Sequence, residues 1–316
     1  MENISDLSVS VVVPLYRSAS LVNVFYERCV GQLNDLCCDW ELILVDDASP
    51  DNTWEIAGLL RERCESVKII RLAHNHGQQH ATLCGLGYAT KNYVITIDDD
   101  LQCFPEDIPL FIEQLASGKE VVIGRIARQE KQHSWLRNVG SRINQQLAGK
   151  IIGKPKGISL SSYRGMTRKV AERLVAYKGA HPHIAALLFK SVPVAYIGNV
   201  DIRHAPRGDG GGTSYSWQKL VKTLSYLLIN HSYLPLRLMI GWGVAISLAS
   251  LGFALWVLVQ GLVFGYTATG WASLAVLISF LSGNILLALG VVGEYLGRLV
   301  EEASNITQFS VFEERI

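Results

Sequence analysis

Three consecutive aspartates, Asp98, Asp99 and Asp100, directly follow an apolar run of strand length at residues 94–97. Adjacent carboxylates repel one another, so the arrangement is unfavourable unless a cation lies among them. Because alternate residues of an extended chain point the same way, we expect Asp98 and Asp100 to converge while Asp99 points aside. Mg²⁺ is usually shared between one or two carboxylates and substrate phosphates. The pattern predicts a metal–diphosphate site, with a solvated acidic turn as the alternative.

A second acidic cluster, Asp46, Asp47 and Asp51, follows another segment expected to form a strand, at residues 40–45. In a parallel sheet the carboxyl ends of the strands lie at one edge, and open α/β sheets bind their ligands there. Two acidic strand ends at the same edge favour a binding site over a solvated turn.

Strand-like and helix-like segments alternate through the first two thirds of the chain. Strands are expected at residues 9–14, 40–45, 67–72, 93–97, 120–124, 158–163 and 192–202. Helices are expected at residues 20–36, 53–63, 78–89, 134–152 and 167–177, and a further helix begins near Pro105. This alternation predicts an α/β domain with a mostly parallel sheet that is covered by helices on both faces.

The last third of the chain has a different character, because residues 238–293 contain no Asp, Glu, Lys, Arg or His. This run is about twice the ~20 apolar residues that a helix needs to cross a bilayer. It predicts two transmembrane helices, at residues 238–263 and 271–292. Basic residues flank the pair on its outer sides only: Lys219, Lys222, Arg237 and Arg298. The positive-inside rule then places both termini in the cytoplasm.

The remaining composition narrows the class of protein. A net charge of +1 over 316 residues gives no indication of nucleic-acid binding. Residues 1–8 lack the apolar core of a signal peptide. The six cysteines form no Cys-x-x-Cys pair, which favours a reducing compartment and disfavours structural zinc.

Two segments lie between the α/β region and the apolar run. Residues 203–213 form a Gly-rich stretch with basic flanks, which favours anion binding, with a flexible linker as the alternative. Residues 216–230 have the pattern of an amphipathic helix at the membrane interface, with a core helix as the alternative. The expected parts are a cytoplasmic domain, a juxtamembrane region, the two spans and a cytoplasmic tail, at residues 1–213, 214–236, 237–300 and 301–316.

Several motifs, in this order, resemble one family. The strongest are Val-Val-Val-Pro-Leu-Tyr at residues 11–16, Asp-Asp-Ala-Ser-Pro-Asp-Asn-Thr at 46–53, and Asp-Asp-Asp-Leu-Gln at 98–102 with Pro105 and Glu106. Weaker matches lie at residues 75–78, 162–164, 212–215 and 293–298. From residue 9 to 298 the chain is similar to the membrane-anchored GT-A (Rossmann-like) glycosyltransferases of family 2, which load a sugar onto polyprenyl phosphate. Dolichyl-phosphate mannose synthases and bacterial undecaprenyl-phosphate glucose and aminoarabinose transferases belong to this group.

The resemblance implies roles for particular residues. A nucleotide sugar would bind along the sheet edge, against Pro14, Tyr16, Asp46, Asp47, Asp51, Asp98 and Asp99. Asp98 and Asp100 would hold Mg²⁺ or Mn²⁺ on the diphosphate. The lipid acceptor explains the spans and a place in the inner membrane, and a homo-oligomer is compatible with this interpretation. The basic residues beside the membrane would hold the acceptor phosphate, with general adhesion to anionic lipid as the alternative: Arg203, Arg207, Lys219 and Lys222.

The chain also departs from the family pattern. Where the family usually has Pro-x-Tyr-Asn-Glu, this chain has Arg17 and Ser18 after Tyr16, and Ser162 replaces an aspartate that often precedes Phe-Arg. The Gln-x-x-Arg-Trp motif of processive polysaccharide synthases is absent, which favours a single transfer over polymerisation.

The sequence therefore predicts inverting transfer of one sugar from a UDP- or GDP-sugar to undecaprenyl phosphate at the cytoplasmic face. A phosphate monoester is already largely a dianion at neutral pH and needs no general base, so Ser162 is tolerable and Arg164 is expected to orient the acceptor. Two alternatives are a different lipid acceptor, and a membrane-tethered sugar-nucleotide-binding protein without catalytic turnover.

Overall fold

The computed structural model describes residues 7–36, 39–126, 154–179, 182–205, 234–264, 270–303 and 308–316. The chain divides into two compact units, residues 1–214 with 306–316, and residues 215–305. The predicted helices at residues 134–152 and 216–230 lie outside the described residues.

The first unit is built on an eight-stranded sheet. Its strands are β1 (Ser8–Leu15), β2 (Asp39–Asp46), β3 (Val67–Leu72), β4 (Tyr93–Thr96), β5 (Val121–Ile126), β6 (Arg164–Thr167), β7 (Ile197–Ile202) and β8 (Val311–Arg315). Their spatial order is β7-β5-β6-β4-β1-β2-β3-β8. Only β6 and β8 pair antiparallel with their neighbours among these strands, so the prediction of a mostly parallel sheet is confirmed.

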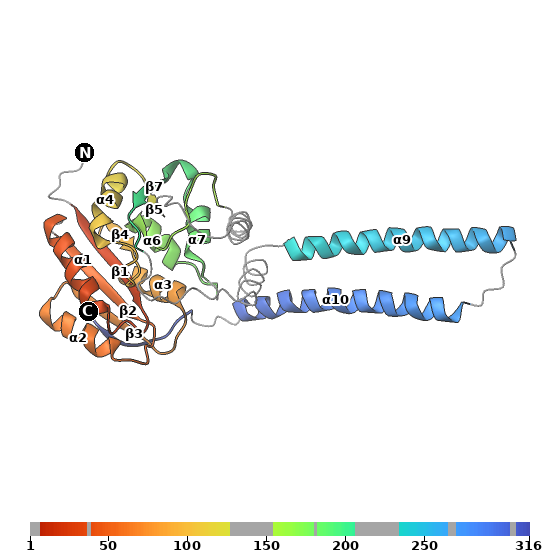
Figure 1. The fold of residues 1–316 in the computed structure, drawn as a ribbon, viewed down its shortest axis with the longest axis horizontal. Helices are drawn as coiled ribbons and strands as arrows, with labels where there is room; N and C mark the ends of the chain where they lie inside the picture. The colour runs from red at the N-terminus through yellow and green to blue at the C-terminus, as the bar shows by residue number, and fades with distance from the viewer. Residues whose placement is uncertain are drawn as a thin grey trace. The chain divides into compact units, whose positions relative to one another are not determined.

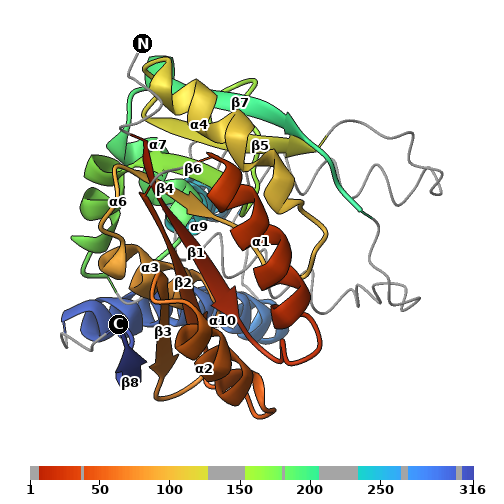
Figure 2. The ribbon, with the colours of Figure 1, turned by 90° about the vertical axis from the view of Figure 1, so that its left-hand side faces the viewer.

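Helices cover both faces of this sheet (Figure 2). On one face lie α1 (Val22–Leu36), α2 (Thr53–Arg63) and α4 (Ile108–Ala116), which follows a 3-10 turn at Pro105–Asp107. On the other lie α3 (Gln78–Tyr88), α6 (Arg168–Val175) and α7 (Ile184–Ser191). Successive residues of β1 are buried in opposite cores: Val11 and Val13 in one, Val12 in the other. This explains the unbroken apolar run, because a strand covered on both faces has no polar side.

A glycine sets the close approach of α3 to the sheet. A Cβ atom at Gly85 would lie 2.4 Å from Cγ1 of Val12 and 3.0 Å from Cγ2 of Val45. A side chain there would push the helix away from β1 and β2. The glycine is unfavourable for helix formation but is required by the packing.

The strand order places the acidic strand ends together. β1 is hydrogen-bonded to β2 on one side and to β4 on the other, so the chain reverses its direction of winding between β1 and β4. Such a switch point opens a crevice at the carboxyl ends of the strands. The segments after β1 and β4 flank it, and the two acidic clusters follow β2 and β4, which both run parallel to β1 and end at the same side of the sheet.

Two strands begin later in the chain than the sequence predicted. A strand was expected at residues 158–163, but β6 begins at Arg164, and β7 begins at Ile197 after a 3-10 turn at Val194–Tyr196. Residues before β6 are polar and use their side chains locally, as where Ser161 Oγ accepts from Tyr163 N at 3.1 Å. Such bonds compete with strand pairing. No element was predicted for α7 or β8.

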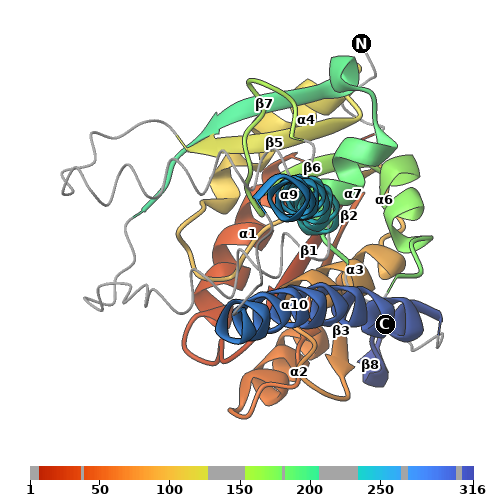
Figure 3. The same ribbon diagram turned by 90° about the vertical axis from the view of Figure 1, so that its right-hand side faces the viewer.

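The end of the chain returns to the first unit. β8 pairs antiparallel with β3, with Leu72 opposite Val311 and Ile69 opposite Arg315 (Figure 3). The pairing continues beyond the strand, because Ala73 N donates to Ser310 O at 2.8 Å. β8 therefore covers β3, which would otherwise present unpaired backbone groups at the edge of the sheet.

The second unit contains two helices, α9 (Leu234–Phe264) and α10 (Trp271–Ala303), which lie side by side (Figure 1). Trp242 Nε1 in α9 donates to Asn284 Oδ1 in α10 at 2.9 Å. Among the described residues, one segment is long and apolar enough to cross a membrane, Phe280–Gly297 in α10, with mean hydropathy 1.4 and none of it buried. Helices thus lie where the sequence predicted two spans, and the crossing of a membrane by both stays a prediction.

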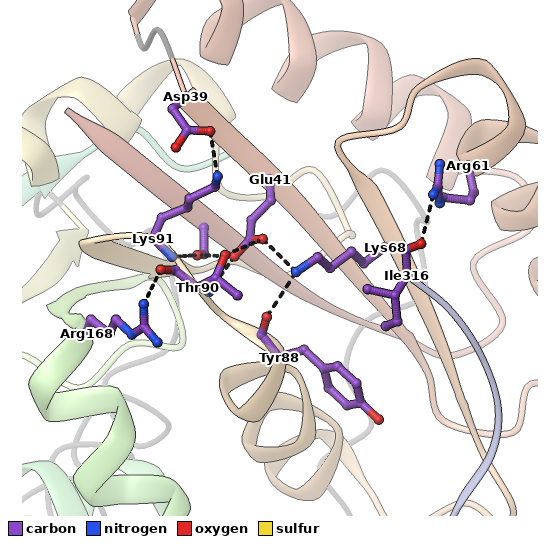
Figure 4. Close-up of polar contacts among 10 residues, drawn as sticks. Asp39, Glu41, Arg61, Lys68, Tyr88, Thr90, Lys91, Arg168 and Ile316 are labelled. Atoms are coloured by element: carbon purple, nitrogen blue, oxygen red, sulfur yellow. Dashed lines mark hydrogen bonds and ion pairs between the residues drawn. The ribbon is translucent and has the colours of Figure 1, made fainter. Parts of the chain in front are cut away.

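A buried ion pair joins neighbouring strands near their amino ends, on the opposite side of the sheet from the crevice (Figure 4). The side chain of Glu41 is only 5% exposed and pairs with Lys68 Nζ at 2.8 Å. It also accepts from Ser10 Oγ at 2.6 Å and from Thr90 N at 2.6 Å. Burial alone would raise the pKa of Glu41, but these hydrogen bonds outweigh burial and the net pKa is lowered. The carboxylate links β1, β2, β3 and the segment that leads into β4.

We predict that Glu41→Gln destabilises the first unit by about 1–3 kcal/mol, since it removes the charge that compensates Lys68 and weakens several hydrogen bonds. Because folding lowers the pKa of Glu41, its contribution is present above the unfolded pKa of about 4.3 and is lost as the pH falls through the folded pKa. Urea denaturation at pH 7 and at lower pH measures this, with the exposed Glu65→Gln as a control. An equal destabilisation by both variants would contradict the prediction.

Candidate active site

A cavity of about 790 Å³ opens at the carboxyl ends of β1 to β4. Segments after all four strands line it: Pro14, Leu15, Tyr16, Arg17, Ser18, Leu21, Asp47, Asn75, Gly77, Gln78, Asp98, Asp99, Asp100, Leu101 and Gln102. Its size suits a ligand larger than a monosaccharide. The site predicted from the two acidic clusters therefore coincides with a cavity.

Neutral donors hold the carboxylate of Asp98 from two sides. Ser162 Oγ donates to Oδ2 at 2.6 Å, and Gln78 Nε2 donates to Oδ1. Burial raises the pKa of Asp98, its hydrogen bond from Ser162 opposes this, and the charge of Asp100 raises it further. The carboxylate is fixed in direction but its charge is incompletely compensated.

Asp99 and Asp100 also line the cavity, although Asp99 was expected to point aside. Burial raises the pKa of Asp99 to about 6, its acidic neighbours add to this, and Ser18 in the segment after β1 opposes it. Asp100 Oδ1 accepts from Gln102 N at 3.1 Å. Leu101 between them has a φ of 56°, so the chain turns sharply here and keeps all three carboxylates at the cavity.

The carboxylates at this point suit a hard divalent cation. No group of three or more His, Cys, Asp or Glu side chains within the described ranges is arranged to hold a metal by itself. The charge of Asp100 raises the pKa of Asp98, so the two carboxylates repel one another. Two carboxylates that leave the other ligand positions to substrate phosphates and water fit the usual environment of Mg²⁺.

The second acidic cluster divides into one cavity residue and two structural ones. Asp47 lines the cavity and accepts from His76 N and Gly77 N, both at 2.8 Å. Asp46 is 1% exposed, accepts from Ser49 N at 3.0 Å and lies 3.3 Å from Arg71 Nε. Burial raises the pKa of Asp46 while the Ser49 hydrogen bonds oppose it.

Asp51 acts within the loop after β2. Its Oδ1 accepts from Thr53 Oγ1 at 2.6 Å, and Ala19 N donates to Oδ2 at 3.4 Å. Neither Asp46 nor Asp51 is among the cavity-lining residues, so their role in nucleotide binding stays a prediction.

The segment after β1 is held in an unusual conformation. Arg17 has a φ of 58°, in the left-handed region that costs a non-glycine residue about 1–3 kcal/mol. Arg17 N donates to Ser49 Oγ at 3.0 Å, and Ser18 N donates to Thr53 Oγ1 at 2.9 Å. Pro14 and Tyr16 line the cavity, and Tyr16 is 45% exposed.

Arg164 is not among the residues that line the cavity. It is 7% exposed, and its Nε donates to Ser161 O. Burial lowers the pKa of Arg164 to about 10, while the charge of Asp98 opposes this. The neighbouring Tyr163 ties this segment to the loop after β4, because its hydroxyl donates to Phe104 O at 3.1 Å. Arg164 therefore acts on Asp98, and contact with an acceptor phosphate stays a prediction.

The predicted basic residues are placed only in part. Arg203 pairs with Asp107, with Nη2 at 2.7 Å and Nε at 2.8 Å from Oδ1, and its backbone N donates to Oδ2 at 2.9 Å. It is not among the residues that line the cavity. Arg207, Lys219 and Lys222 lie outside the described residues. The acceptor site formed by these four residues thus stays a prediction.

Sequence reasoning assigned no role to several polar residues of the cavity, among them Arg17, Gln78 and Gln102. Gln78 is the first residue of α3 and follows the loop after β3. The predicted site residues likewise follow the carboxyl ends of their strands. The position of these residues directly after parallel strands was therefore the signal that could have identified them. The acidic clusters indicated only the carboxylates of the site and not its neutral and basic side chains.

Comparison with known proteins agrees with this geometry. Residues 10–175 match glycosyl transferase family 2. An uncharacterized glycosyltransferase, YkcC, of Bacillus subtilis (strain 168) is 31% identical over 307 residues, 95% of this chain and 91% of that protein. Undecaprenyl-phosphate 4-deoxy-4-formamido-L-arabinose transferase of Pseudomonas paraeruginosa (strain DSM 24068 / PA7) is 32% identical over 98% of this chain and 90% of its own length.

A crystal structure of a mycobacterial protein has a TM-score of 0.50 and 17% identity, and the match covers 72% of this chain and 76% of that one. This likeness concerns the fold alone. The sequence matches span the sheet, the cavity and nearly the whole chain, and the chain accordingly belongs to glycosyl transferase family 2 and is a glycosyltransferase.

Proposed function

We propose that this glycosyltransferase moves one sugar from a UDP- or GDP-sugar to undecaprenyl phosphate at the cytoplasmic face of the membrane, with inversion. The observation that carries the proposal is the cavity at the switch point, where Asp98, Asp99 and Asp100 meet Asp47. Relatives that match nearly the full length are named as transferases to undecaprenyl phosphate.

The donor would lie along the sheet edge. Pro14, Tyr16 and Asp47 form the part of the cavity after β1 and β2, which suits the nucleoside. Asp98 and Asp100 would hold Mg²⁺ or Mn²⁺, which as a Lewis acid stabilises the charge of the leaving nucleoside diphosphate. Ser162 and Gln78 orient the Asp98 carboxylate before substrate arrives. Fixed ligands of this kind need no rearrangement when charge develops.

The acceptor would be a phosphate rather than a hydroxyl. A phosphate monoester has a second pKa of about 6 and attacks without giving a proton to the protein. It instead needs positive charge and alignment with the leaving group. We assign this role to Arg203, Arg207, Lys219 and Lys222, together with the buried charge of Arg164 beside Asp98. Arg203 would have to share its guanidinium between Asp107 and the acceptor.

The two long helices would anchor the enzyme where the lipid phosphate lies. We propose that α9 and α10 both span the inner membrane, with the catalytic domain (residues 1–213), the juxtamembrane region and the tail in the cytoplasm. The support is the uncharged run across both helices and the basic residues on their outer sides. The hydrogen bond between Trp242 and Asn284 would join the helices within the apolar layer, where interhelical hydrogen bonds contribute to association.

Purified full-length enzyme, given undecaprenyl phosphate and a panel of UDP- and GDP-sugars, should release nucleoside diphosphate only when the lipid phosphate is present. Asp98→Asn or Asp100→Asn should lower turnover by about two orders of magnitude or more, because each removes a charged metal ligand at little steric cost. EDTA should stop the reaction and Mg²⁺ or Mn²⁺ should restore it. The exposed Asp35→Asn is the matched control. Release that does not depend on the lipid phosphate, or that persists in EDTA, would refute the proposal.

Arg164→Met should lower turnover at least tenfold and also lower the melting temperature, because it removes the positive charge that acts on the buried Asp98 and leaves that carboxylate less compensated. Ser162→Ala should keep most activity, since Gln78 still holds Asp98 and no general base is required. Turnover and thermal unfolding of both variants test this. A folded but inactive Ser162→Ala enzyme would indicate that the acceptor attack needs a side chain at this position.

Thr267→Cys, placed in the loop between the predicted spans, should react with a membrane-impermeant maleimide in intact bacterial spheroplasts. Glu27→Cys in α1 should react only after the membrane is opened. Both variants are made in a background without the native cysteines. The opposite labelling pattern would reverse the proposed topology.

A further inference from the structure

Arg17 has a distinctive position in the cavity. Four of the residues that line it carry a carboxylate. Among the described lining residues, only Arg17 carries a positive charge. Arg17 is exposed, and its guanidinium carbon lies 5.5 Å from the centre of the ring of Tyr16, which also lines the cavity. A cation at this point faces a site that would receive a strongly anionic ligand.

The guanidinium of Arg17 is also unusual because no carboxylate within the described ranges pairs with it. Most other arginines there are engaged, as Arg28 is with Glu106 at 2.8 Å and Arg71 with Asp46 at 3.3 Å. Arg17 has Asp47, Asp98, Asp99 and Asp100 around the same cavity and is bonded to none of them. Its charge therefore remains available for a ligand.

The backbone holds this side chain in place at an energetic cost. The φ of 58° at Arg17 suits glycine or asparagine better than arginine, and asparagine is the residue that the sequence resemblance predicts here. Hydrogen bonds from Arg17 N to Ser49 and from Tyr16 N to Ser18, at 3.0 and 3.1 Å, keep the turn fixed. A turn alone would not require a long basic side chain, so the arginine indicates a function of the guanidinium.

We propose that Arg17 binds a phosphate of the nucleotide donor, in the same cavity as the carboxylates assigned to the metal; this rests on the proposed function. A guanidinium presents a planar set of donors that matches phosphate oxygens. The donor is favoured over the lipid phosphate because the segments after β1 and β4 are adjacent: Ile97 N donates to Val12 O at 3.2 Å, and Ser18 and Asp99 line the same cavity. Arg17 thus lies beside the residues assigned to the diphosphate.

The test measures binding of UDP, GDP and the corresponding nucleosides to the full-length enzyme, with Mg²⁺ and again in EDTA. Arg17→Gln should raise the Kd for the diphosphate about tenfold in both conditions and leave the Kd for the nucleoside within about twofold. Arg17→Lys should lie between, because it keeps the charge but not the planar donor geometry. Arg63→Gln, an exposed arginine at the end of α2, removes an equal charge away from the cavity and serves as the control.

The outcomes separate the two proposals. Wild-type enzyme that binds neither diphosphate overturns the proposed function and the role of Arg17 with it. Normal diphosphate binding by both the wild type and Arg17→Gln overturns the role of Arg17 alone. Equal loss of nucleoside affinity would show that Arg17 acts through the shape of the turn, and a change only in the KM for undecaprenyl phosphate would move Arg17 to the acceptor; each overturns the assignment to the donor.

Discussion

Repulsion among carboxylates at one edge of a parallel sheet is the constraint on which the rest of this structure depends. Three of them, Asp98, Asp99 and Asp100, follow β4 without a break, and Asp47 joins them from β2. Burial raises the pKa of Asp98 and Asp99, so ionisation of these two carboxyl groups is less favourable in the folded protein than in water. A site of this kind is stable when a cation enters it, and the same requirement makes it suitable for a metal-bound diphosphate.

The protein fixes these carboxylates mainly with uncharged groups. Ser162 and Gln78 donate to Asp98, and the backbone of His76 and Gly77 donates to both oxygens of Asp47. Neutral donors orient a carboxylate and leave most of its charge for the ligand, whereas a salt bridge would neutralise it. Two carboxylates of the scaffold, Asp107 and Glu41, are instead paired with basic side chains, Arg203 and Lys68.

The chain also links its two units by more than one connection. After α10 it returns to the sheet, where β8 pairs with β3, and β3 leads directly into the loop that holds Asp47. Arg71 in the same strand contacts the buried Asp46. The edge strand β8 therefore supports the donor side of the cavity through β3, whose own edge it covers.

The sequence alone determined the α/β alternation, the acidic strand ends and the apolar run, because each is a local pattern that burial or charge imposes on neighbouring residues. It misplaced β6 and left β8 unpredicted, since a short strand is decided by the partner available to it rather than by its own residues. Sequence could not show that Asp47 lines the cavity while Asp46 and Asp51 lie outside it. It also gave no role to Arg17, whose meaning comes from a left-handed turn and an unpaired charge. Only the tertiary structure decides such points, because they depend on which side chains from distant segments meet.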